Sequence, residues 1–223
     1  MSNNTKKSTA ETMKIRTPEF RASFPALFEP KKVNNQGEAK YSVQMLFQVK
    51  ETETSKKLGV KVVDITPLMK AVEACAISAL GPDKSKWPKM EWPFRKGEEK
   101  DYDGYGPGVV FATASTKIKP GIVHAFAGPD GKPAPLTVPT DFYGGCIALA
   151  TVNPYYWKYM GKQGVSFGLQ NVQKLRDCEM FGGRAKAADD FDAIEPPEGA
   201  SPADAKTGAA AVNGGDPLGM LPS

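Results

Sequence analysis

Two stretches near the start of the chain alternate between apolar and polar residues, one over residues 21–28 and the other over residues 41–48. The apolar positions that share a face are Ala22, Phe24, Ala26 and Phe28 in the first stretch and Tyr41, Val43, Met45 and Phe47 in the second. A period of two predicts β-strands with one buried face. The sequence Asn-Asn-Gln-Gly at residues 34–37 is typical of a turn, so the two strands are expected to form an antiparallel pair.

The clearest helical pattern covers residues 67–80. Its apolar stripe consists of Leu68, Val72, Cys75 and Ala79. Thr66 is the expected N-cap, Pro67 fits the first helical position, and the Gly-Pro pair at residues 81–82 ends the pattern. Cys75 is therefore predicted to be a core residue rather than a reactive thiol.

Further strands are predicted at residues 109–116, 122–127, 146–153 and 164–175, with a Pro-Asp-Gly turn after the second of these. Residues 81–108 carry no clear periodicity. Long connections without regular structure are uncommon in compact domains and are often functional.

Many short strands and a single helix predict a mainly β fold, specifically an OB-fold-like five-stranded antiparallel barrel with one capping helix. The helix follows the second predicted strand, whereas the usual OB order places it after the third, so an extra hairpin is expected. We predict a disordered N-terminal arm at residues 1–17, the barrel domain at residues 18–183, and a disordered acidic tail at residues 184–223.

The charge of the chain is divided unevenly. From Ala187 onward the chain contains seven acidic residues and one basic residue, Lys206, so this segment has a charge of −6. Because the whole chain carries +4, residues 1–186 carry +10. A body this basic attracts polyanions, chiefly nucleic acid or an anionic membrane. An ordinary solvated basic surface is the alternative.

Several classes of protein are disfavoured by composition. No apolar run approaches the roughly 20 residues that a membrane span requires, and residues 1–11 are polar without an apolar signal region. Cys75, Cys146 and Cys178 are widely spaced and His124 is the single histidine, so neither a zinc site nor another cofactor is expected. Reduced thiols in a cytoplasm are the simplest interpretation.

Four aromatic residues fall within five positions at residues 155–159, at the end of an apolar strand. Successive side chains of a strand point to opposite faces, so these rings cannot all enter one core. Tyr155, Tyr156, Trp157 and Lys158 are therefore candidates for stacking on unpaired bases, which is worth roughly 1–3 kcal/mol per base. The alternative is an edge strand whose aromatic residues cover a loop.

A second aromatic and basic cluster lies in the connection at residues 81–108. We expect Trp87 and Trp92 to be structural plugs, and Arg95, Tyr102 and Tyr105 to bind nucleic acid. The candidate phosphate contacts elsewhere are Arg21, Lys31, Lys32, Lys40, Lys117, Lys119, Lys174 and Arg176, and Tyr41 joins the candidate DNA-binding residues. Any one of these cations can equally be ordinary surface charge.

Enzyme signatures are missing from the sequence, which has neither a GxxxxGK[ST] loop nor a GxSxG elbow. The acidic residues Glu98, Glu99, Asp101 and Asp103 could hold a metal ion in a nuclease, although a charged run in a loop is usually only solvated. In the tail, the acidic residues Asp189, Asp190 and Asp192 surround Phe191 and Ile194, which could anchor in a partner protein. A plain linker is the alternative for this segment.

Together these segments resemble the bacteriophage single-stranded-DNA-binding proteins of the OB-fold kind, a family long known only as a domain of unknown function. The matching pieces are residues 21–30, 40–47, 105–115, 119–123, 142–146 and 164–192. The resemblance implies a protein without catalysis or cofactor that coats single-stranded DNA during phage replication or recombination in the host cytoplasm. A metal-dependent nuclease and a phage structural protein are the alternatives.

Two departures from the family pattern stand out. Cys178 occupies a position where an Arg-Asp-Gly-Glu turn would have glycine, and a neutral extension follows the acidic segment at the end of the chain. The resemblance therefore implies that the segment recruiting partners is internal rather than terminal.

Overall fold

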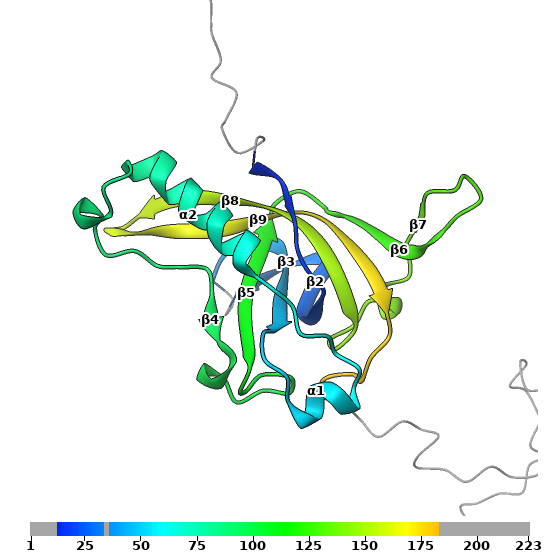
Figure 1. Cartoon of the computed structure of the whole chain (residues 1–223). Coiled ribbons are helices and arrows are strands. Elements are labelled where there is room, and N and C mark those ends of the chain that lie inside the picture. Colours follow the sequence, from blue (N-terminus) through cyan, green and yellow to red (C-terminus); the bar gives the residue numbers. More distant parts are fainter. Residues whose placement is uncertain (1–12, 34–35, 183–223) are drawn as a thin grey trace, which may run out of the picture. The chain divides into compact units, whose positions relative to one another are not determined.

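The computed structural model describes residues 13–33 and 36–182 of the 223-residue chain, all within the first of two compact units, which spans residues 1–183 (Figure 1). Its elements in chain order are β1 (Ile15–Arg16), β2 (Phe20–Val33), β3 (Gln36–Gln48), α1 (Glu53–Lys57), α2 (Thr66–Leu80), β4 (Arg95–Lys96), β5 (Val109–Thr116), β6 (Gly121–Ala127), β7 (Pro133–Pro135), β8 (Ile147–Tyr159) and β9 (Lys162–Arg176). Three short 3₁₀ turns cover Lys84–Lys86, Gly97–Glu99 and Pro139–Asp141. The predicted acidic tail lies outside the described residues.

Five strands pair in a closed circuit, in the order β2, β3, β5, β9, β8 and back to β2. The closing pairs place Phe20 opposite Ala148 and Arg21 opposite Ile147. This confirms the predicted mainly β, OB-fold-like barrel of five strands. The prediction that all strands are antiparallel is wrong, because β9 runs parallel to both β5 and β6. Long connections separate β9 from these strands, and such connections allow parallel pairing.

The barrel interior is filled by the inward side of each strand. Val43, Met45 and Phe47 are fully buried, as their alternation predicted, and the ring of Phe47 meets that of Phe20 edge-on at 5.9 Å. Phe24 departs from the pattern, because 57% of its surface is exposed. The pairing register of β2 and β3 shifts between Ser23 and Ala26, which turns Phe24 out of the core.

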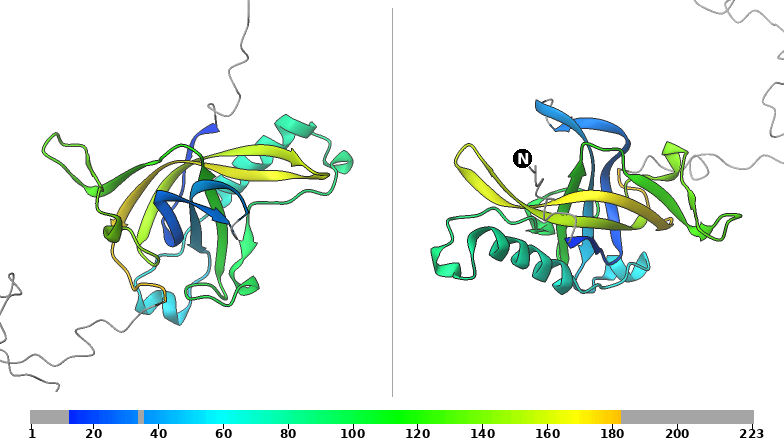
Figure 2. Two further views of the ribbon diagram at one scale, coloured as in Figure 1. Left: turned by 180° about the vertical axis from the view of Figure 1, so that it is seen from behind. Right: turned by 90° about the horizontal axis from the view of Figure 1, so that it is seen from above.

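Helix α2 packs against β8 and β9 (Figures 1 and 2). Leu68, Val72 and Cys75 are buried as predicted, whereas Ala76 takes the place that the stripe assigned to Ala79. The predicted N-cap is one residue off, because the helix includes Thr66 and Ile65 is the cap. The turn into the helix is instead fixed by Asp64, whose Oδ1 accepts a 2.8 Å hydrogen bond from the backbone N–H of Thr66.

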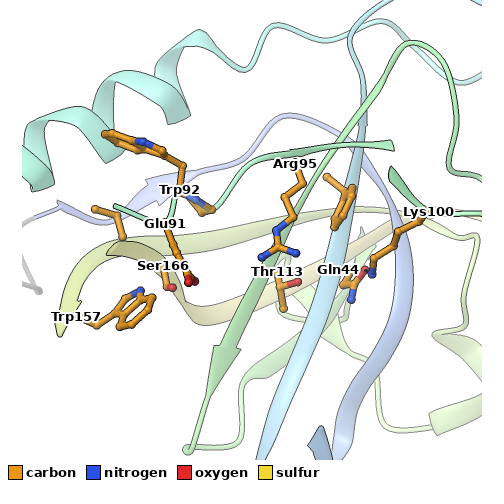
Figure 3. A pocket seen from close by; sticks show the side chains of 11 residues that line it. Gln44, Glu91, Trp92, Arg95, Lys100, Thr113, Trp157 and Ser166 are labelled. Atoms are coloured by element: carbon orange, nitrogen blue, oxygen red, sulfur yellow. Dashed lines mark hydrogen bonds between the residues drawn. The ribbon is translucent and has the colours of Figure 1, made fainter. Parts of the chain in front are cut away.

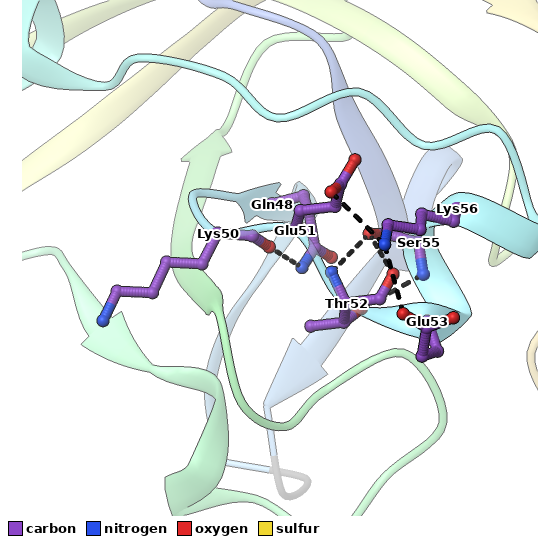
Figure 4. A network of polar contacts seen from close by, with 7 residues as sticks. All are labelled: Gln48, Lys50, Glu51, Thr52, Glu53, Ser55 and Lys56. Atoms are coloured by element: carbon purple, nitrogen blue, oxygen red, sulfur yellow. Dashed lines mark hydrogen bonds and ion pairs between the residues drawn. The ribbon is translucent and has the colours of Figure 1, made fainter.

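The short helix α1 was not predicted from the sequence. Reciprocal hydrogen bonds cap it: Thr52 Oγ1 accepts from the N–H of Ser55 at 3.1 Å, and Ser55 Oγ accepts from the N–H of Thr52 at 2.9 Å (Figure 4). Lys56 adds ion pairs with Glu51 and Glu53 at 3.5 and 3.1 Å. A single helical turn shows no apolar periodicity, so its capping residues are its main sequence signal.

The expected extra hairpin is formed by β6 and β7 and projects from the opposite end of the barrel to the β8–β9 hairpin (Figures 1 and 2). The predicted extent of the disordered arm is wrong for residues 13–17. Ile15 pairs with Val152 of β8, and the N–H and hydroxyl of Thr17 both bond to the backbone of Ala150, at 2.9 and 3.0 Å. Within the described ranges, no helix is long and apolar enough to cross a membrane.

Candidate nucleic-acid interface

The candidate interface is the side of the barrel that faces away from the core at β3, β5, β9 and the tip half of β8. We call it the outer face and define it by Gln44, Thr113, Ser166, Tyr155 and Trp157. Strand register brings these residues together: Gln44 pairs with Thr113, and Tyr155 pairs with Ser166. Their neighbours along the strands, such as Met45 and Val165, point into the barrel and are buried.

An open hollow lies on this face (Figure 3). It is lined by Gln44, Glu91, Trp92, Pro93, Arg95, Lys100, Phe111, Thr113, Trp157, Val165 and Ser166. The lining combines aromatic rings, two cations, polar groups and the carboxylate of Glu91, which is itself paired with Lys162 at 3.8 Å. Aromatic rings and cations are the chemistry that unpaired bases and phosphates require. Strands 2 and 3 of an OB-fold barrel, here β3 and β5, form the side on which such folds hold oligonucleotides.

The segment before β4 is held on the barrel by backbone hydrogen bonds. The N–H of Glu91 donates to Gln163 O at 2.9 Å, and the N–H of Val165 donates to Glu91 O at 3.0 Å. A Cβ atom at Gly164 would lie only 2.3 Å from Glu91 O, so the approach requires a residue without a side chain. This attachment places Trp92 in the wall of the hollow with 45% of its surface exposed.

The two tryptophans predicted as plugs therefore differ. Trp87 is half-buried against the core, and its Nε1 donates a 2.9 Å hydrogen bond to Gly81 O, in agreement with a structural role. Trp92 packs 6.4 Å from it between ring centroids, as a structural plug would, and it also lines the hollow. The alternation rules gave no signal for this residue, because its position depends on the distant strand β9.

Arg95 and Lys100 supply positive charge to the hollow, and neither forms an ion pair with any residue in the described part of the chain. Lys100 Nζ lies 4.9 Å from the centroid of the Phe111 ring and 5.5 Å from that of Tyr105. Burial, assisted by the charge of Arg95, lowers the pKa of Lys100 below its usual value. Two cations that repel each other in this way favour an anionic ligand between them.

Tyr105 lies beside Lys100 and is fixed to the barrel by hydrogen bonds. Its hydroxyl donates to Gln44 Oε1 at 2.5 Å and lies 3.1 Å from Ser23 Oγ, while burial raises its pKa. Tyr102, beside it, is 57% exposed. Of the two tyrosines in residues 81–108 that were predicted to bind DNA, the structure thus presents Tyr102 to solvent and ties Tyr105 to the barrel.

The aromatic cluster of β8 divides as a strand requires. Tyr156 pairs with the buried Val165, packs against the core and donates its hydroxyl to Gln163. Tyr155 and Trp157 lie on the opposite side, and Trp157 lines the hollow. Its indole Nε1 is shielded from solvent and finds no hydrogen-bond partner among the described residues. Lys158 is exposed near the hairpin tip.

The β2–β3 hairpin carries a second group of candidate cations. Lys31 and Lys40 face each other directly across the hairpin, an arrangement of like charges that is destabilising in the absence of an anion. Lys32 and Lys119 are exposed, and Tyr41 is half-buried opposite Thr116. Lys117 is paired with Glu38, and this contact lowers the pKa of the Glu38 carboxyl.

Three predicted phosphate contacts are engaged within the protein, and we remove them from the candidate site. Arg21 is 8% exposed and donates to Glu179 O at 2.8 Å. Lys174 forms a 2.6 Å ion pair with Asp177 and has only 11% of its side chain exposed. Arg176 donates to Gly59 O at 2.9 Å. The partners of Arg21 and Arg176 are distant in sequence, so the residues around these two arginines gave no sign of them.

The alternative metal site is not formed. Within residues 13–33 and 36–182, no three His, Cys, Asp or Glu side chains gather as metal ligands would. Two of the four suspected carboxylates act as caps instead: Glu99 Oε1 accepts from the N–H of Lys96 at 3.2 Å, and Asp103 Oδ2 accepts from that of Gly182 at 2.7 Å.

Comparison with known proteins shows which family this chain is similar to. Putative protein p50 of Acyrthosiphon pisum secondary endosymbiont phage 1 is 31% identical over 201 residues, which cover 83% of this chain and 96% of p50. The structure of the single-stranded DNA-binding protein from bacteriophage Enc34 in complex with ssDNA superposes with a TM-score of 0.55 at 19% identity, covering 77% of this chain and 91% of the other. A second structure of that protein gives 0.54 at 20% identity, covering 82% and 92%. At this identity the superpositions establish the shared fold. The family model described as Enterobacter phage Enc34, ssDNA-binding protein, matches residues 13–202, and this chain belongs to that family.

Proposed function

We propose that this protein binds single-stranded DNA through the outer face, with Trp157 and Tyr155 as stacking surfaces and Arg95 and Lys100 as phosphate contacts. Membership of the family gives single-stranded DNA as the ligand and a binding role rather than a catalytic one. The observation that carries the choice of surface is the hollow itself, which Trp157, Trp92, Arg95 and Lys100 all line. Neither cation forms an ion pair with another described residue.

This surface favours unpaired over paired bases. The faces of bases are hidden within a duplex, whereas in a single strand they can stack on aromatic side chains, with roughly 1–3 kcal/mol per base. Since every base has such a face, binding through it is tolerant of sequence.

The cellular role that we propose is coating and protection of single-stranded DNA during phage replication or recombination, in the cytoplasm of the infected host. The cations of the β2–β3 hairpin, Lys31, Lys32 and Lys40, extend the positive surface beyond the hollow. Such a surface guides the backbone of a long strand without reading its sequence.

Fluorescence anisotropy with labelled oligonucleotides tests this function. We expect tight binding to oligo-dT and to mixed single strands, and weak binding to the matching duplex. If about four phosphates are neutralised, log K should fall against log salt with a slope of about −3. Equal affinity for the duplex, or no response to salt, would contradict the proposal. Cleavage of the strand on addition of Mg²⁺ or Mn²⁺ would favour the nuclease alternative.

We also propose that the acidic segment of the tail, with Asp189, Asp190 and Asp192, competes with DNA for the basic surface, while Phe191 and Ile194 anchor partner proteins. Removing residues 187–223 should then tighten DNA binding, most strongly at low salt, where charges are screened least. A matched variant with the three aspartates changed to asparagine separates the two roles. It should bind DNA more tightly than the parent, though less tightly than the truncated protein, and still retain replication or recombination partners in a pull-down.

A further inference from the structure

Phe24 has an unusual backbone conformation, and its ring is exposed although it lies in a barrel strand. Its φ angle is +44°, a region that bulky residues rarely adopt. Its neighbours Ser23 and Ala26 are buried, yet more than half of the Phe24 surface is exposed. The backbone is therefore distorted to turn an aromatic ring out of the core and into solvent. Strain of this kind concentrates at functional sites, and bulges often serve to redirect a side chain next to such sites.

The redirected ring meets other aromatic residues. The centroids of Phe24 and Tyr102 are 5.5 Å apart with the ring planes at 78°. Tyr102 lies 5.9 Å from Tyr105, which in turn lies 5.2 Å from Phe111 in the wall of the hollow. These contacts form a continuous row of rings from the middle of β2 to the hollow.

A cation accompanies this row. Lys100 Nζ lies 5.8 Å from the centroid of the Tyr102 ring and also lines the hollow. An exposed aromatic pair beside a cation offers both a flat surface and a phosphate contact. That combination suits a nucleotide, whose base can stack and whose phosphate can pair with the cation. An apolar peptide would bury the cation without a partner, which is unfavourable.

We infer that Phe24 and Tyr102 form a second stacking platform for an unpaired nucleobase, separate from the one at Trp157. This inference rests on the proposed function, since it assigns further bases of the same strand to the other end of the row. It adds Phe24, which alternation placed in the core, to the residues that contact DNA.

The test compares Phe24→Leu, which keeps apolar bulk but removes the ring face, with Phe24→Tyr, which keeps the face. Phe126→Leu is the matched control, because Phe126 is also an exposed phenylalanine, at 74%, but lies on the β6–β7 hairpin. We expect Phe24→Leu to weaken binding to oligo-dT by about 5- to 150-fold, the effect of losing one stacked base. Phe24→Tyr and Phe126→Leu should bind as the parent does, and the salt slope should not change because no phosphate contact is removed.

The outcomes separate this inference from the proposed function. If the parent binds single strands and folded Phe24→Leu binds equally well, the platform is overturned and the function stands. If the parent fails to bind at all, the function itself is wrong. A second measurement needs no substitution: ultraviolet cross-linking of the unmodified protein to oligo-dT, followed by peptide mapping. A cross-link at Phe24 or Tyr102 supports the platform, and cross-links confined to other peptides overturn it.

Discussion

The guanidinium of Arg21 lies 4.1 Å from the centre of the Phe181 ring, at the other end of the described chain. The same side chain donates hydrogen bonds to Glu179 O at 2.8 Å and to Gly145 O at 3.4 Å. The approach is possible because Gly145 has no side chain; a Cβ there would lie 2.1 Å from Glu179 O. Arg21 therefore fastens the segment after β9 to the first long strand of the barrel.

Two arginine variants should separate stability from binding. Arg21→Ala should lower the free energy of unfolding by about 2–4 kcal/mol, because it removes charged hydrogen bonds and a cation–π contact from a buried position. Arg95→Ala should leave stability unchanged but reduce the steepness of the salt dependence of DNA binding by about 0.7. Urea unfolding and salt titrations measure the two effects. If Arg21→Ala is as stable as the parent but binds DNA poorly, our assignment of Arg21 is wrong.

Adjacent aromatic residues of β8 should respond in opposite ways. Trp157→Ala should weaken DNA binding by about 1–3 kcal/mol with little loss of stability. Tyr156→Ala should destabilise the protein by about 2–3 kcal/mol, since it leaves a cavity beside the core. Tyr156→Phe, which loses only the hydroxyl bond to Gln163, serves as the control for both. Equal effects of the two alanine variants on affinity would show that the strand is not oriented as described.

Gly164→Ala should disturb the hollow without changing any of its charged groups. The added methyl group would meet Glu91 O at 2.3 Å, so the segment that carries Trp92 must move away from β9. We expect a loss of about 1–3 kcal/mol in stability together with weaker DNA binding. Gly161→Asn, at the open tip of the same hairpin, is the control, because asparagine tolerates the positive φ of +76° found there. An unchanged affinity for Gly164→Ala would mean that Trp92 is not needed in the hollow.

Tyr143 should make the fold sensitive to alkaline pH. Burial, together with a 2.8 Å hydrogen bond from its hydroxyl to Asp177, raises the pKa of Tyr143 to about 12. The unfolded chain releases this proton near pH 10, so the contribution to stability is complete below about pH 10 and is lost as the pH rises toward 12. The parent should therefore lose stability over this window more steeply than Tyr143→Phe. Burial also raises the pKa of Cys146 to about 11, but this thiol is common to both proteins and cancels in the difference. Parallel pH curves for the two proteins would contradict the prediction.

Local patterns in the sequence predicted the parts of the structure that depend on near neighbours. Alternation placed Val43, Met45 and Phe47 in the core, because a strand turns each successive side chain to the other face. It also indicated that the rings at residues 155–159 cannot all enter one core, and Tyr156 packs inward whereas Trp157 does not. The helical stripe located α2 in the same way.

Features fixed by distant contacts were missed. The strand at Ile15 and Arg16 consists of two residues and depends on pairing with β8, so it has no periodicity of its own. The exposure of Phe24 follows from a register shift against β3, and the place of Trp92 follows from the bridge between Glu91 and Gly164. No local rule indicates which surface cation finds a carbonyl oxygen on a remote segment, as Arg21 does.

The position of β9 in the circuit also determines when, during synthesis of the chain, the barrel can close. β9 is the last strand among the described residues, yet it pairs with β5, β6 and β8 and contributes Ser166 to the outer face. Pairings between segments so far apart form late in folding, because a long loop must close first. A chain still emerging from the ribosome has the basic residues of β2 and β3 but no closed circuit and no completed hollow. The proposed DNA-binding surface is thus complete only when synthesis has passed residue 176, so an unfinished chain is expected to present only part of it.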